Sequence, residues 1–350
     1  MLAALAIALA TTTAAWAGIT TRSERRQHPH AERASRRSGA IVVDWNQELL
    51  SIVRTPGAQP ATMHPTRSFA ILHAAIYDAV VSITHDAPPY LFTVRGSAGA
   101  RPDAAAAAAA AGHDTLLALY PAMKPALDQQ LAVELSTIPD GLAKQRGVKV
   151  GALTSEIMLA IRAHDGSDAT PQPLPPATQP GQFRPTPPNF TPAVFTHWAD
   201  VAPFVLDRAA QFRPQAPAAL SSAEYGAAIN EVKSAGRDSS RTRTVDETTQ
   251  AKFWAAPIWN YWNQIADDAV LSHHTDLVQS ARLLADLDFS FADAAIAFYD
   301  AKYHDDLWRP ISAIREAASD GNAATIADPN WTPLATTPAD PSYPGAHSVT

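Results

Sequence analysis

Residues 302–310 read KYHDDLWRP, and this stretch decides how the chain folds and what it can bind. Lys302 and Arg309 are seven residues apart, so a continuous helix would bring both cations onto one face after two turns. Pro310 is expected to end or bend that helix, because proline lacks the N–H group that a helix needs. The spacing therefore predicts a pair of cations that face the same point.

A second stretch, residues 341–350, reads PSYPGAHSVT. Its prolines and Gly345 predict a tight turn that leads into the first turn of a new helix, which contains Ala346 and His347. Free backbone N–H groups at the start of a helix attract anions. Two fixed cations, amide donors and a histidine together predict a site for a tetrahedral oxyanion such as phosphate.

The two stretches together resemble the first two motifs of the type 2 phosphatidic acid phosphatase superfamily, which includes the vanadium-dependent haloperoxidases. Lys302, Arg309 and Pro310 fit the first motif without a gap. The second motif usually contains Ser-Gly-His, and residues 345–347 of this chain read Gly-Ala-His. The pair of motifs is more specific than either alone.

The resemblance implies a role for each of these residues. Lys302 and Arg309 resemble the cations that hold the equatorial oxygens of phosphate or vanadate. Gly345 and Ala346 stand where the family places a serine hydroxyl and a glycine amide, so their backbone N–H groups are the donors that remain. His347 resembles the catalytic histidine that acts as general acid and base.

The third motif of the family carries an arginine and the histidine that ligates vanadate or attacks phosphate, and we expect it beyond Thr350. The chain is therefore identified as a C-terminally truncated member of the superfamily, with no metal ligand of its own. As this fragment it is expected to be inactive. The resemblance implies vanadate as the cofactor of a haloperoxidase, and no cofactor for a phosphatase.

Three functions stay open at this point. The first is a vanadium-dependent haloperoxidase, whose small-molecule substrates are hydrogen peroxide and a halide. The second is a soluble acid phosphatase that acts on a phosphate ester without vanadate. The third is a non-catalytic helical scaffold with a degenerate oxyanion site. No feature of the sequence predicts an oligomeric state.

The composition excludes several other classes of function. The chain has 350 residues, of which 46% are hydrophobic, so a sizeable core can form. A net charge of -7 without a basic stripe argues against nucleic acid as a partner. The chain has no cysteine, so neither a disulfide framework nor a thiolate metal site can form. Alanine-rich stretches favour an all-α protein.

The N-terminal residues predict export. Residues 1–17 are largely apolar and end in Ala-Trp-Ala, which is typical of a signal peptide with a small-x-small cleavage site. We therefore expect a secreted or periplasmic protein. Residues 18–39 are polar, rich in arginine and serine, and expected to form a disordered linker. No later stretch is long and apolar enough for a stable membrane span.

The rest of the chain divides into three regions. An N-terminal helical region covers residues 40–165, and a proline-rich segment that wraps over the surface covers residues 166–217. Residues 218–350 form the incomplete C-terminal catalytic region. The fold implied by the resemblance is a helical bundle of the haloperoxidase type, with the extended proline-rich segment between two helical halves.

Hydrophobic spacing and capping residues predict the individual helices. In the first half they are a short helix capped by Asp44 and helices at 66–83, 104–119, 125–135 and 141–163. In the second half capping boxes at 221–224 and 244–247 open two helices, and two more follow at about 267–286 and 289–308. His73, inside the helix at 66–83, is interpreted as a buried structural residue.

Overall fold

The structure, a computed structural model, describes residues 29–58, 63–95 and 99–350. Within these residues the chain is helical, and the only extended pairings are two isolated bridges, Gln182 with Leu307 and Arg237 with Pro333. The predicted all-α fold is confirmed. The predicted signal peptide, residues 1–17, lies outside the described residues.

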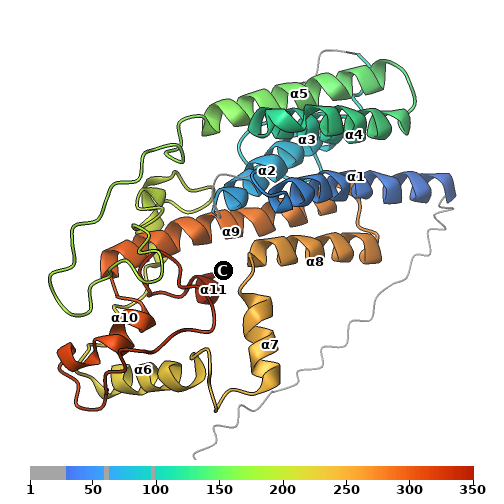
Figure 1. Cartoon of the computed structure of the whole chain (residues 1–350). Helices are drawn as coiled ribbons and strands as arrows, with labels where there is room; N and C mark the ends of the chain where they lie inside the picture. Colours follow the sequence, from blue (N-terminus) through green and yellow to red (C-terminus); the bar gives the residue numbers. More distant parts are fainter. Residues whose placement is uncertain (1–28, 59–62, 96–98) are drawn as a thin grey trace, which may run out of the picture.

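The helices of the first half are α1 (Pro29–Arg54), α2 (His64–Thr84), α3 (Ala104–Leu119), α4 (Lys124–Ser136) and α5 (Leu142–Arg162). This half is built around one central helix, α2, and α4 packs on α3 at the outside (Figure 1). All residues of α2 from Ser68 to Ile83 are buried, because α2 contacts α3, α5 and the long C-terminal helix α9 (Leu277–Asp305). An apolar helix without a solvent-facing stripe is the expected centre of such a core.

The alanine-rich helix α3 packs closely on α5. Residues Ala106 to Ala111 are buried, and the facing positions of α5 are Gly147 and Gly151. A Cβ atom on Gly151 would lie 2.2 Å from the carbonyl oxygen of Ala107. The small residues therefore permit backbone contact between the two helices, which larger side chains would prevent.

The proline-rich segment crosses the molecule with only two short 3-10 turns, Trp198–Asp200 and Ala209–Phe212. Asp293 on α9 accepts hydrogen bonds from the backbone N–H groups of Phe204, Val205 and Leu206, at 2.6, 2.7 and 2.8 Å. Two of its aromatic side chains, Phe190 and Phe212, are exposed, and the other four are buried: Phe183, Phe195, Trp198 and Phe204. The segment is thus anchored to the helical core.

The second half contains α6 (Ala223–Ala235), α7 (Val245–Trp254), α8 (Ile258–His273), α9, α10 (Pro310–Arg315), a short 3-10 turn (Ala317–Ser319) and α11 (Ala346–Val349). The capping box at Thr244 and Glu247 is confirmed, whereas α6 is capped by Ser222 instead of Ser221. The helix predicted at 267–286 is interrupted, because α8 ends at His273 and α9 begins at Leu277; α9 then continues through the break predicted between residues 286 and 289 and ends at Asp305. Asp276 caps its start, and residues 287–288 continue the helix.

The first helix also differs from its prediction. α1 begins at Pro29, inside the predicted linker of residues 18–39, and Asp44 lies within this helix instead of capping a new one. The hydrophobic positions from Ile41 to Leu50 are buried against α3, α8 and α9, so tertiary packing stabilises a longer helix than local signals indicate.

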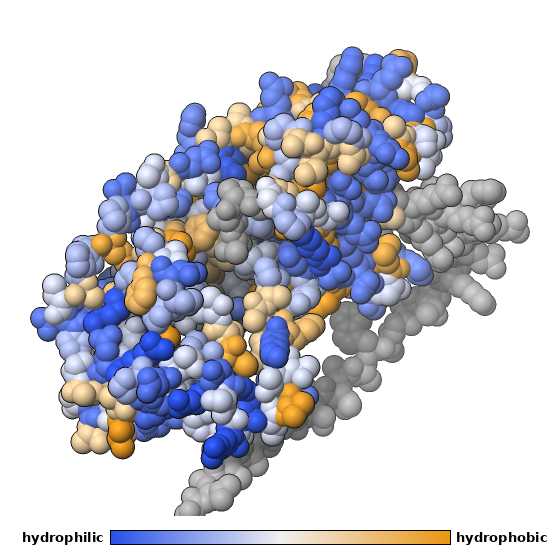
Figure 2. All heavy atoms as spheres, viewed as in Figure 1, coloured by the Kyte–Doolittle hydropathy of each residue, from blue (hydrophilic) through white to orange (hydrophobic). Residues whose placement is uncertain are grey.

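None of the described helices is both long and apolar enough to cross a bilayer. On the face drawn in Figure 2, hydrophobic residues form scattered groups between hydrophilic ones and do not make a continuous band.

Candidate oxyanion site

Lys302 and Arg309 come together, but not along one helix as predicted. α9 ends at Asp305, and Asp306 adopts a left-handed backbone with φ of 49° that terminates the helix. Arg309 instead precedes the first residue of α10, where Pro310 fixes the backbone at the helix start. The chain therefore turns between the two cations.

Backbone hydrogen bonds hold this turn on both sides. Phe183 donates to the carbonyl of Asp306 at 2.8 Å, and Trp308 donates to the carbonyl of Gly181 at 2.7 Å. On the other side, Ser342 donates to the carbonyl of Leu307 at 2.8 Å. The proline-rich segment and the 339–342 loop thus fix the turn that directs Arg309 back toward Lys302.

Both cations reach the same short loop, residues 340–341. The ammonium of Lys302 donates to the carbonyl of Pro341 at 2.5 Å, and Nε of Arg309 donates to the carbonyl of Asp340 at 2.5 Å. The carboxylate of Asp340 forms an ion pair with the guanidinium of Arg309 and lies 3.7 Å from the ammonium of Lys302. Oxygen atoms of one loop therefore contact both of the predicted oxyanion-binding cations.

Burial makes this pair of cations electrostatically unusual. Only 1% of Lys302 is exposed. Burial, and then the positive charge of Arg309, lowers the pKa of Lys302 to about 7. Burial also lowers the pKa of Arg309 to about 10, so this guanidinium stays charged at neutral pH. The cost of burying two like charges together is reduced by any anion placed between them.

The second predicted stretch lies on α11. Gly345 precedes this four-residue helix with φ of -65°, an ordinary value for any residue, and Ala346 has no positive φ either. Ala346 therefore fits where the family usually has glycine. His347 is exposed, and no hydrogen bond or ion pair within the described chain joins it to Lys302 or Arg309.

Sequence reasoning missed Asp340. It lies 38 residues after Lys302 and 31 after Arg309, outside both recognised motifs, so no local spacing connects it with the cations. The loop that carries it is positioned by tertiary contacts. The backbone N–H of Val194 donates to the carbonyl of Ala339 at 2.9 Å, which ties this loop to the proline-rich segment.

A cavity of about 410 Å³ opens beside Arg309. Its lining is largely apolar and comes from the end of α6, from α7, from the start of α10 and from residues 331–338. Lys252 and Arg243 also line it. A small molecule could reach Arg309 through this cavity, although Lys302, Gly345 and His347 are not among its lining residues.

A second group of polar side chains is buried between α1, α2, α8 and α9. His73 lies 3.1 Å from the amide oxygen of Asn46 and 3.5 Å from the carboxylate of Asp288, so its interpretation as a buried structural residue agrees with the structure. Burial lowers the pKa of His73 to about 3 and raises the pKa of Asp267 to about 7. His73 is therefore neutral at physiological pH.

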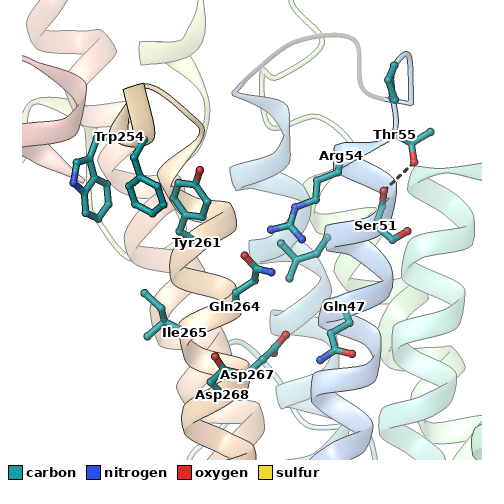
Figure 3. A pocket seen from close by; sticks show the side chains of 13 residues that line it. Gln47, Ser51, Arg54, Thr55, Trp254, Tyr261, Gln264, Ile265, Asp267 and Asp268 are labelled. Atoms are coloured by element: carbon teal, nitrogen blue, oxygen red, sulfur yellow. Dashed lines mark hydrogen bonds between the residues drawn. The ribbon is translucent and has the colours of Figure 1, made fainter. Parts of the chain in front are cut away.

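A cavity of about 860 Å³ borders this group but none of the predicted site residues (Figure 3). Asp267 and Asp268 lie on the α8 side, and Gln47 and Arg54 face them from α1. The exposed aromatic side chains of Phe253 and Trp254 on α7 and the half-buried Tyr261 on α8 also line it.

The chemistry of the candidate site suits an anion and not a metal cation. Within the described ranges, no group of three or more His, Asp or Glu side chains could hold a metal ion. The converging groups are an ammonium and a guanidinium, which bind the oxygens of a tetrahedral oxyanion. Lys302 and Arg309 therefore fit vanadate or phosphate, both of which are oxyanions.

Comparison with known proteins agrees with the fold and with the C-terminal motifs. Residues 282–350 match the family described as the VCPO second helical-bundle domain. A bacterial vanadium-dependent iodoperoxidase superposes with a TM-score of 0.68 at 22% identity, over 89% of this chain and 78% of that one. No curated protein matches the chain.

Two bacterial vanadium-dependent chloroperoxidase structures are also similar. The apo form has a TM-score of 0.63 at 13% identity, over 82% of this chain and 75% of that one. The holo form has a TM-score of 0.63 at 14% identity, over 85% of this chain and 76% of that one.

The helical fold and the paired cations define a class, the all-α proteins with the vanadium haloperoxidase fold. Residues 282–350 thus match the VCPO second helical-bundle domain, and the chain as a whole has the fold of bacterial vanadium-dependent haloperoxidases.

Proposed function

We propose that this chain carries the oxyanion site of a secreted vanadium-dependent haloperoxidase, which oxidises a halide with hydrogen peroxide. The observation that supports this most directly is the convergence of Lys302 and Arg309 on one buried point. The similar structures are those of a vanadium-dependent iodoperoxidase and a vanadium-dependent chloroperoxidase, which also supports the proposal.

Each site residue has a separate role in this proposal. Lys302 and Arg309 bind and neutralise the oxyanion, and backbone N–H groups of Gly345 and Ala346 add hydrogen bonds. His347 would hold or move a proton at the edge of the site. Bound vanadate supplies the centre at which peroxide is activated toward halide. We propose that residues 1–350, in which we find no third motif, bind the anion without turnover.

The first test measures vanadate binding to the 350-residue chain by calorimetry. Arg309→Ala should weaken binding by about tenfold to a hundredfold, because a hydrogen bond to a charged group contributes about 1.5–3 kcal/mol. The matched control is Arg237→Ala, because Arg237 pairs with Asp328 at 2.6 Å and lies outside the site. Equal affinity of the Arg309→Ala and control variants would contradict the site assignment.

Activity assays separate the alternatives. Bromide oxidation by peroxide that depends on added vanadate would support the haloperoxidase, and such turnover by residues 18–350 would contradict the proposal that this chain binds the anion without turnover. Hydrolysis of a phosphate ester, inhibited by vanadate, would favour the soluble phosphatase. A chain that binds neither vanadate nor phosphate would favour the non-catalytic scaffold.

A further inference from the structure

We propose that Asp340 is an internal counter-ion that competes with external oxyanions for Lys302 and Arg309. This inference rests on the proposed function, since it concerns the same two cations. Asp340 would thereby determine how tightly the site binds oxyanions and which anions it prefers. Anions that carry more charge than one carboxylate would displace it best.

The contacts of Asp340 occupy the donors that an oxyanion needs. Its carboxylate pairs with the guanidinium of Arg309 and lies 3.7 Å from Nζ of Lys302. Its carbonyl takes the Nε–H of Arg309 at 2.5 Å. The carbonyl of Pro341 accepts a hydrogen bond from Nζ of Lys302 at 2.5 Å. The carboxylate oxygens of Asp340 stand in for oxygens of a bound oxyanion, whereas the two backbone carbonyls keep their contacts and hold the cations in place.

Charge balance favours exchange with a more highly charged anion. Only 6% of Asp340 and 1% of Lys302 are exposed, so the groups interact in a medium of low dielectric constant. When Lys302 is protonated, the group formed by Lys302, Arg309 and the Asp340 carboxylate has a net charge of about +1. A dianion such as sulfate would neutralise both, whereas a retained Asp340 carboxylate would repel it.

The side chain can leave without moving its backbone. Ala339 is tied to Val194 at 2.9 Å and Ser342 to Leu307 at 2.8 Å, so both ends of the loop are fixed. The carboxylate of Asp340 is attached through two rotatable bonds. Pro338 and Arg309 both line the cavity of about 410 Å³, which gives an incoming anion a route beside the loop.

A purely structural role for Asp340 makes different predictions. An ion pair that only anchors the 339–342 loop would be lost in Asp340→Asn, and added anions would not replace it. A counter-ion that occupies the oxyanion position would be replaced by the anion itself. Binding affinity and anion-dependent stability therefore distinguish the two roles without any assay of turnover.

The experiment compares the 350-residue wild type with Asp340→Asn and Asp340→Ser, using orthovanadate and sulfate as probes. Calorimetry should show that both variants bind each anion about tenfold to a hundredfold more tightly than the wild type. Without anions their melting temperatures should be lower, and sulfate should restore them. Asp340→Glu, which keeps the charge, should bind as weakly as the wild type.

The matched control is Asp328→Asn, which removes another arginine-paired carboxylate, 2.6 Å from Arg237. It should leave both anion affinities unchanged. Equal affinities in the wild type and both Asp340 variants would overturn the inference and leave the proposed function standing. Absence of binding in every protein, including both Asp340 variants, would overturn the proposed function and the competition together. Lost stability that sulfate does not restore would make Asp340 a structural residue only.

Discussion

Lys302 shows how a single buried residue can link pH to both stability and binding. Its pKa is lowered to about 7, first by burial and then by Arg309, from an ordinary value of 10.5. Between these two values the unfolded chain holds a proton that the folded chain lacks. Stability therefore rises with pH across this window, whereas oxyanion binding, which needs the charged ammonium, falls as pH rises through about 7.

Sulfate is a suitable probe for this effect because its own charge stays constant near neutral pH. We expect sulfate affinity to fall by about tenfold as the Lys302 ammonium loses its proton. Lys302→Met should bind sulfate weakly at every pH between 6 and 9, with a flat profile. Calorimetry across this range checks the prediction, and a wild-type profile as flat as that of the variant would contradict it.

Gly345 is the position at which the chain departs from the usual serine of the family. Its φ of -65° suits serine, and a Cβ atom there would meet first the Oγ atom of Ser348 at 3.3 Å, which can rotate away. We expect Gly345→Ser to fold normally and to bind vanadate about threefold to tenfold more tightly through one added hydrogen bond. Calorimetry measures this change.

Gly57→Ser provides the comparison for that substitution. Gly57 has φ of 83°, so serine there should lower the melting temperature through backbone strain and leave vanadate affinity unchanged. If Gly345→Ser unfolds the chain, or leaves affinity at the wild-type value, the assignment of Gly345 to the oxyanion site loses its support.

At the scale of elements, α3 and α5 show what an alanine-rich helix contributes. The helix buries little side-chain volume, but the facing glycines of α5 bring the two backbones into contact. Gly151→Ala should destabilise the protein by about 1–3 kcal/mol, because its Cβ atom would lie 2.2 Å from the carbonyl oxygen of Ala107. Denaturant unfolding followed by circular dichroism measures the change.

The same substitution in α6 serves as the control. A Cβ atom on Gly226 would meet side-chain atoms, the nearest being Nδ2 of Asn322 at 3.2 Å, which can shift. Gly226→Ala should therefore cost clearly less than Gly151→Ala. Equal unfolding midpoints for the two variants would show that α3 and α5 can shift apart and accommodate the added Cβ atom at little cost in stability.

At the scale of the whole molecule, the proline-rich segment connects the two helical halves and supports the candidate site. Asp293 holds it to α9 through three backbone donors, and Arg213 forms two hydrogen bonds of 2.7 Å with Asp300 further along the helix. The same segment fixes the turn before Arg309. Its attachment should therefore influence both stability and anion binding.

Asp293→Ala would leave the N–H groups of residues 204–206 without their acceptor. We expect a loss of about 1–3 kcal/mol, the cost of one unsatisfied buried donor, because the N–H of Phe204 is buried whereas those of Val205 and Leu206 are only part-buried. Limited proteolysis should then cut faster within residues 170–217. Asp286→Ala removes an exposed carboxylate of the same helix, and it should change neither measurement. Unchanged cleavage in Asp293→Ala would mean that other contacts hold the segment.

The sequence by itself determined the helical class, most helix positions and the two cations. Local signals sufficed there: hydrophobic spacing gave α2, and Asp103 and the alanine run gave the bounds of α3. Prediction from the sequence failed where tertiary contacts override the local sequence signals. α9 runs through the predicted break at residues 287–288, because its apolar face packs against α1 and α2 along this stretch.

Only the tertiary structure decided how the candidate site is assembled. The spacing of Lys302 and Arg309 suggested one helix face, yet a left-handed Asp306 ends α9 between them. The cations meet because backbone hydrogen bonds from residues 181–183 and 342 fold the turn back. Asp340 joins them from a loop distant in sequence, and a charge interaction across such a separation leaves no periodic signal in the sequence.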